Sequence, residues 1–116
     1  MRSATVRREL MVMTRDSVLL QRIRAGDREA LDLLIDAYQP IIDRLAGRLR
    51  GRGLCDLDLI AEGTVGLVRA ARCCPISQEC HFLPVAVCWI HRTIESAIDE
   101  QIAADAVKRP IGGDWV

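Results

Sequence analysis

The segment 51–71, GRGLCDLDLIAEGTVGLVRAA, constrains this chain most, because it joins an abrupt turn to a helix with two unlike faces. Gly51 and Gly53 end the preceding helix, and Asp56 suits the N-cap of the next one. Five apolar residues then recur at helical spacing: Leu57, Ile60, Leu67, Val68 and Ala71. This spacing predicts a helix that buries one face in a core.

A second face of this predicted helix points to solvent or to a partner. It carries Asp58, Glu62, Val65 and Arg69, spaced three or four residues apart. Two carboxylates one turn apart cost an isolated helix about 0.2–0.5 kcal/mol, and Gly63 and Gly66 each cost up to about 1 kcal/mol relative to Ala. We expect these penalties to be compensated, at the glycines by close packing.

Periodicity elsewhere predicts two helices before this one. The first is capped by Asp16 or Ser17 and stops at Gly26, after which Asp27 caps the second. The second has a long apolar stripe and should kink or divide at Pro40. The residues of that stripe are Leu31, Leu34, Ile35, Tyr38, Ile42, Leu45 and Leu49.

A fourth helix is predicted after a loop over residues 73–81, with Pro84 in its first turn. Its core positions are Val87, Ile90, Ile94, Ile98, Gln101 and Ile102. The sequence therefore predicts an all-α fold, a compact bundle of about four helices in one domain over 16–106. Segments 1–15 and 107–116 lack strong periodicity and are expected to be a flexible N-terminal segment and a C-terminal tail.

The composition indicates a core built from aliphatic side chains. Half of the residues are hydrophobic, yet the chain has only two Trp, one Tyr and one Phe. Uninterrupted apolar runs stay far short of the ~20 residues that a membrane helix needs, and no secretory segment is present. We expect a cytoplasmic protein with no membrane contact.

Several motifs follow one another in a recognisable order. They are AGDREAL at 25–31 with Tyr38, RGL at 52–54, DLIAEG at 58–63, GL at 66–67, Phe82, and WIHR at 89–92. On these residues the chain resembles region 2 of the sigma-70 family, the initiation subunits of bacterial RNA polymerase. The resemblance covers about 17–105 and implies the sigma region 2 type of helical bundle.

The resemblance implies that the third helix docks on a coiled coil in the largest subunit of core RNA polymerase. Positions that match the docking surface are Asp58, Ala61, Glu62, Thr64 and Val68, and the outward Val65 and Arg69 extend it. A basic partner would stabilise the acidic patch, speed encounter and fix register. The alternative is an ordinary solvated helix face.

The resemblance also implies that the fourth helix and the loop before it open promoter DNA. Candidate DNA contacts are Arg48, Arg52, Phe82, Trp89 and Arg92. The first two belong to a basic cluster of Arg44, Arg48, Arg50 and Arg52, opposed locally only by Asp43, which either faces phosphate or is a solvated helix end. Phe82 also suits a core position, and Trp89 could instead cover the third helix.

The DNA-facing half departs from the family pattern. Cys80, Val85 and Cys88 stand where many members carry aromatic residues, and each lost stack removes about 1–3 kcal/mol of single-strand affinity. Arg92 and Glu95 stand where primary members carry an amide and a hydroxyl. Residues 92–105 hold one arginine against four acids, which is a poor electrostatic footprint for DNA. Promoter recognition is therefore a weaker expectation than polymerase binding.

Complete family members carry a separate helix-turn-helix domain, and this chain ends before one could begin. Three interpretations stay open. The chain is a domain of a longer sigma factor, a single-domain protein whose second subunit carries the helix-turn-helix, or a repurposed module. Such a module would bind the polymerase clamp, as a co-sigma subunit or decoy, without reading promoters.

The cysteines and histidines give only weak signals of chemistry. Cys73, Cys74, Cys80 and His81 could converge on a zinc ion, but their spacing is unlike that of paired zinc ligands. Five cysteines are an odd count for a disulfide framework, and buried reduced thiols are the commoner outcome. Neither histidine lies in a catalytic motif, so we expect no cofactor and no enzymatic activity.

Overall fold

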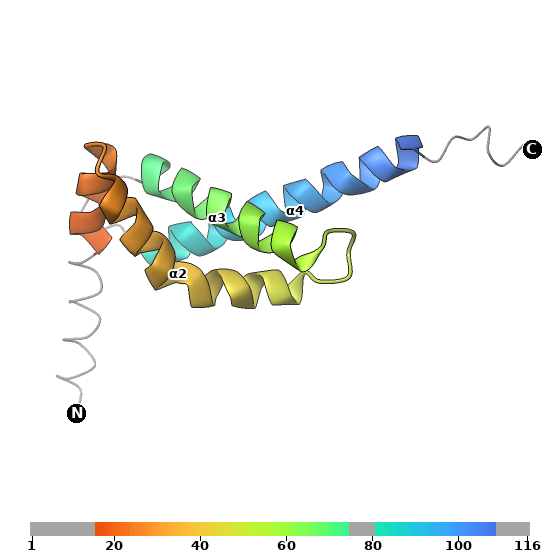
Figure 1. Ribbon diagram of the computed structural model, residues 1–116, viewed down its shortest axis with the longest axis horizontal. Coiled ribbons are helices and arrows are strands. Elements are labelled where there is room, and N and C mark those ends of the chain that lie inside the picture. The colour runs from red at the N-terminus through yellow and green to blue at the C-terminus, as the bar shows by residue number, and fades with distance from the viewer. Residues whose placement is uncertain (1–15, 75–80, 109–116) are drawn as a thin grey trace, which may run out of the picture.

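The computed structural model describes residues 16–74 and 81–108, and within them the secondary structure is entirely helical. A helix over residues 16–24 precedes α2 (Arg28–Arg48), α3 (Asp56–Cys73) and α4 (Phe82–Lys108). α3 packs on α2 and, more extensively, on α4 (Figure 1). The prediction of an all-α bundle is confirmed. None of the helices in the described ranges combines the length and apolar character that crossing a membrane requires.

The junction between the first two helices follows its local sequence signals. Gly26 has φ +93°, a left-handed conformation that ends the helix over 16–24. Asp27 is the N-cap of α2 as predicted, and its Oδ1 accepts a hydrogen bond from the Ala30 amide at 3.2 Å. Arg22 Nε donates to Asp27 Oδ2 at 2.8 Å. These bonds, first that of Arg22, lower the pKa of the Asp27 carboxyl.

α2 remains one helix through Pro40 and is not divided there. Figure 1 shows that its ribbon changes direction partway along, as expected where a proline removes a backbone hydrogen bond. The predicted apolar stripe is confirmed at Leu34, Tyr38, Ile42 and Leu45, which are all buried. α2 therefore presents a continuous face to the core.

The start of α3 differs from the prediction. Asp56 is the first residue of the helix, not its N-cap, and Cys55 holds the N-cap position without a side-chain hydrogen bond. The Asp56 carboxylate instead accepts two hydrogen bonds from the Arg50 guanidinium, one of them from Nε at 2.9 Å. Arg50 and Asp56 therefore join the α2–α3 turn to the first turn of α3.

The buried face of α3 also differs from the predicted stripe. Leu57 was expected in the core but is 79% exposed, whereas Leu59 is fully buried. Leu57 is excluded because the buried face runs through Leu59, Gly63 and Gly66, and small residues contribute to it as much as large ones.

The two glycines of α3 lie at close contacts with the neighbouring helices. A Cβ at Gly66 would lie 2.8 Å from Ile90 Cα and 2.8 Å from the Trp89 carbonyl oxygen. A Cβ at Gly63 would lie 2.8 Å from Ile42 Cγ2. Because the atoms facing Gly66 belong to the backbone of α4, they cannot rotate away as a side chain can. The predicted close packing is confirmed, and it requires a residue without a side chain at position 66.

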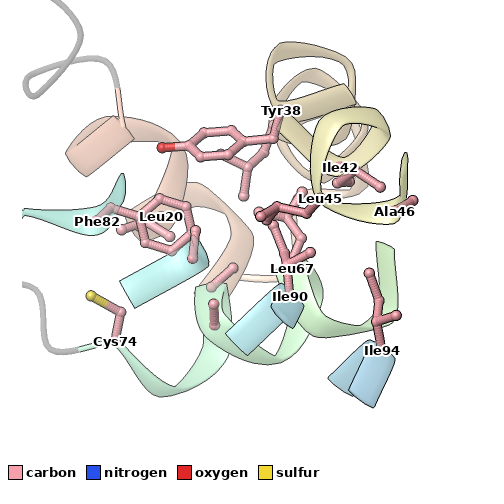
Figure 2. Close-up of a cluster of buried hydrophobic side chains, with 14 of the residues drawn as sticks. Leu20, Tyr38, Ile42, Leu45, Ala46, Leu67, Cys74, Phe82, Ile90 and Ile94 are labelled. Atoms are coloured by element: carbon pink, nitrogen blue, oxygen red, sulfur yellow. The ribbon is translucent and has the colours of Figure 1, made fainter. Parts of the chain in front are cut away.

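Aliphatic side chains from all four helical segments gather in one core (Figure 2). At one end of it the Tyr38 ring meets Phe82 edge to face, with ring centroids 5.4 Å apart. The Tyr38 hydroxyl donates a 2.7 Å hydrogen bond to Asp16 Oδ2 in a buried setting. Burial, followed by this contact with the Asp16 carboxylate, raises the pKa of Tyr38.

α4 extends past the rest of the bundle. Pro84 lies in its first turn as predicted, and Ile90, Ile94 and Ile98 are buried. The prediction that Ile102 joins the core is wrong, because Ile102 is 53% exposed and lies beside the α2–α3 turn, where a Cβ at Gly53 would be 3.8 Å from its Cγ1. The end of α4 projects beyond α2 and α3 (Figure 1). The helix continues through Lys108, two residues into the segment expected to be a tail.

Adding one methyl group at position 66 tests the α3–α4 contact. Gly66→Ala should lower the free energy of unfolding in urea by about 1–3 kcal/mol through overpacking, despite the better helix propensity of alanine. Gly47→Ala is the matched control, since a Cβ there meets nothing within 4 Å, and it should be neutral or stabilising by up to about 1 kcal/mol. Equal effects of the two substitutions would contradict the contact.

Replacing the single tyrosine tests its buried hydrogen bond to Asp16. Because the folded-state pKa of Tyr38 is raised, its contribution to stability is present below the unfolded-state pKa of about 10 and is lost as pH rises further. Tyr38→Phe should lower the free energy of unfolding by about 1–3 kcal/mol at neutral pH. In the unaltered chain, part of the loss of stability at alkaline pH should coincide with the rise of tyrosinate absorbance. Tyr38→Phe should lack that part of the loss. The same alkaline loss in both proteins would rule this role out.

Candidate functional site

The outward surface of α3 carries both carboxylates that the sequence singled out. Asp58 is exposed and Glu62 is half-buried, so the prediction that they face outward is confirmed. Neither has an ion-pair or hydrogen-bond partner among residues 16–74 and 81–108. Their negative charge is therefore not neutralised within the described part of the molecule.

An apolar row runs beside these two acids. Leu57, Ala61 and Val65 recur every four residues and are all exposed, Leu57 at 79% and Val65 at 41%. Together the five residues Leu57, Asp58, Ala61, Glu62 and Val65 form what we call the α3 outer face. The sequence prediction missed Leu57, although its four-residue spacing from Ala61 and Val65 was a signal for this row.

The remaining α3 candidates border the outer face. Arg69 is exposed, whereas Thr64 and Val68 are half-buried. The Thr64 hydroxyl donates to the Ile60 carbonyl at 2.9 Å, so its proton is already committed within the helix. Thr64 can therefore offer a partner only its oxygen as an acceptor. Acidic and apolar groups side by side suit a basic partner that also buries apolar surface.

The basic cluster around the α2–α3 turn is more neutralised than its sequence suggested. The expectation that only Asp43 opposes it is wrong, because the fold brings two further acids to it. Arg50 is paired with Asp56, and Arg52 Nη1 lies 4.0 Å from Glu95 Oε1 of α4. The same Glu95 oxygen lies 3.5 Å from His91 Nε2, one turn earlier on α4.

Of the arginines in the basic cluster and the predicted DNA contacts, three remain exposed without an ion pair to a described residue. Arg44 and Arg48 lie near the end of α2, and Arg92 lies on α4. None of them has an ion-pair partner among the described residues. The pairing of Arg52 with Glu95 brings the α2–α3 turn next to the α4 segment that carries Arg92. Of the predicted DNA contacts, the structure thus brings Arg52 and Arg92 to one neighbourhood.

The two aromatic candidates have different surroundings. Phe82 is 5% exposed, meets Tyr38 edge to face and belongs to the buried cluster that also contains Leu20 (Figure 2), so its ring is not an exposed platform for a base. Trp89 is half-buried and packs against the edge of the core, and its carbonyl oxygen faces Gly66 of α3. Only Trp89 keeps part of its ring accessible.

The four residues considered as weak zinc-ligand candidates form no site within the described residues. Cys74 is buried, Cys73 and His81 are exposed, and Cys80 lies outside the described residues. No group of three or more His, Cys, Asp or Glu side chains in the described ranges could hold a metal ion. Cys74 instead lines the core near Phe82 (Figure 2).

Comparison with known proteins gives one consistent family. The family model described as Sigma-70 region 2 matches residues 34–101. The RNA polymerase sigma factor SigA of Listeria monocytogenes is 34% identical over 103 residues, which are 89% of this chain and 27% of that protein. SigA of Clostridium acetobutylicum is 37% identical over 93 residues, 80% of this chain and 24% of that protein. The chain spans about a quarter of the length of these curated relatives.

Proposed function

The chain belongs to the sigma-70 region 2 family, and we propose that it binds core RNA polymerase and takes part in transcription initiation. The observation that carries this proposal is the α3 outer face, whose two acids have no partner in the described structure. The role is one of binding, with no catalytic step assigned to the chain.

The proposed polymerase contact uses the complete α3 outer face. Asp58 and Glu62 would pair with basic side chains on the coiled coil of the largest subunit, while Leu57, Ala61 and Val65 would bury apolar area beside them. Charge complementarity fixes register and speeds encounter, and the apolar row adds affinity that salt does not screen. Thr64, Val68 and Arg69 would border this contact.

The proposed nucleic-acid contact uses residues of α4, of the α2–α3 turn and of the end of α2. Trp89 offers a partly exposed ring for one base, and Arg48, Arg52 and Arg92 offer charge to phosphates. Four acids on α4, Glu95, Asp99, Glu100 and Asp105, oppose binding to a polyanion. This surface would therefore bind a melted strand held in place by the polymerase better than it binds free DNA.

Reading the upstream promoter element would need a helix-turn-helix domain in addition to residues 16–108. We propose that the remainder of a longer protein or a second subunit supplies it. Both arrangements keep the polymerase contact on α3 and differ only in how the second domain is attached.

Reversing the charge of the α3 outer face tests the polymerase contact. Asp58→Lys combined with Glu62→Lys should weaken binding to core RNA polymerase by about a hundredfold or more, because each like-charge contact costs several kcal/mol. Affinity is measured by fluorescence anisotropy of the labelled chain, with helicity checked by circular dichroism.

The matched control reverses two acids with the same spacing on α2. Asp32→Lys combined with Asp36→Lys changes the net charge by the same amount on an exposed face outside the proposed contact. This control should bind polymerase within about threefold of the unaltered chain. Unchanged affinity of the α3 variant, or an equal loss in both variants, would contradict the proposal.

Trp89 tests the contact with the melted strand. In the complex with core polymerase, Trp89→Ala should weaken binding of a fluorescent single-stranded non-template oligonucleotide about 5- to 150-fold, because one base stack is lost. Trp89→Phe should retain most of the affinity. If the alanine variant binds the strand normally, Trp89 only covers the edge of the core, and the chain is better described as a polymerase-binding module without strand recognition.

A further inference from the structure

One ion pair connects the α2–α3 turn to the middle of α4. Arg52 Nη1 lies 4.0 Å from Glu95 Oε1, and the same oxygen lies 3.5 Å from His91 Nε2. The side chains of Arg52 and Glu95 are 53% and 44% exposed. A single carboxylate oxygen thus faces two nitrogen groups at the surface, where solvent and ions reach all three.

The pairing of Arg52 is looser than that of its neighbour Arg50. Arg50 donates two hydrogen bonds to Asp56, one from Nε at 2.9 Å, and this pairing raises the pKa of Arg50. Arg52 makes one contact at the outer limit of an ion pair, and exposed pairs of this kind contribute little to stability. Arg50 is therefore fixed to the turn, whereas Arg52 can exchange its partner.

Glu95 is set among the groups proposed to meet nucleic acid. It lies one turn after Arg92 on α4, and the next charged residues along the helix are Asp99 and Glu100. Between Arg92 and Lys108 the helix has no basic residue, and among the described residues Arg52 is the arginine that lies within ion-pair distance of Glu95. A phosphate approaching here meets a repelling carboxylate and an arginine that this carboxylate already engages.

We propose that Glu95 competes with phosphate for Arg52 and thereby limits the affinity of this surface for a nucleic-acid backbone. The inference rests on the proposed function, whose strand-binding surface it concerns. A phosphodiester must displace the Glu95 carboxylate before it can pair with the guanidinium. Glu95 is accordingly a positioning residue, acting through the side chain of Arg52.

Neutralising Glu95 in the complex with core polymerase tests this competition. Glu95→Gln should raise the affinity for the fluorescent non-template single strand about two- to fivefold at moderate salt. Because one more phosphate is contacted, the slope of log K against log salt should steepen by about 0.7, as for single strands. Both effects should disappear when Glu95→Gln is made together with Arg52→Gln, since the two residues act as a coupled pair.

Glu100→Gln is the matched control. It removes the same charge from an exposed position on the same helix where the described residues offer no ion-pair partner. The effect of Glu100→Gln on strand affinity should be smaller than that of Glu95→Gln and should leave the slope of log K against log salt unchanged. It should also persist when Arg52→Gln is present.

The possible results separate this inference from the proposed function. If Glu95→Gln has no effect, or raises affinity equally with and without Arg52, simple repulsion explains the data and the competition is overturned alone. If neither the unaltered chain nor Glu95→Gln binds the strand in the complex, the competition and the proposed strand contact are both overturned. The polymerase contact is judged separately, by the α3 variants.

Discussion

The close approach of α3 and α4 at Gly66 is the constraint on which the rest of this structure depends. A Cβ added at Gly66 would lie only 2.8 Å from backbone atoms of α4, so the two helices meet backbone to backbone. This contact fixes the rotation of α3 about its own axis, because only the face with Gly63, Gly66 and Leu59 can be buried. The same rotation exposes Leu57, Asp58 and Glu62.

The fold could be predicted well from the sequence wherever the signal was local. The Asp27 cap, the apolar face of α2, the position of Pro84 and the outward acids all depend on residues within one or two helical turns. Leu57 was assigned wrongly because an apolar residue at helical spacing was counted as core, whereas the buried face runs through Leu59, Gly63 and Gly66.

Contacts between distant residues could not be predicted in the same way. Asp16 contacts Tyr38, and Arg52 contacts Glu95, only after the helices have packed. No residue spacing along the chain predicts either pair. The candidate site therefore differs from its prediction more than the fold does. Asp56 and Glu95 pair with two arginines of the basic cluster, and Phe82 lies in the core. The two proposed surfaces differ in kind, since Asp58 and Glu62 have no ion-pair partner among the described residues whereas Arg52 has one.

Hydrogen exchange of the chain with and without core RNA polymerase tests most directly whether α3 is the docking helix. The account predicts slower amide exchange on binding in 56–73, strongest in the turns that carry Leu57, Asp58 and Glu62, with 28–48 nearly unchanged. Exchange that slows in α2 while α3 stays unaffected would contradict the account, because the docking surface would then lie on a different helix.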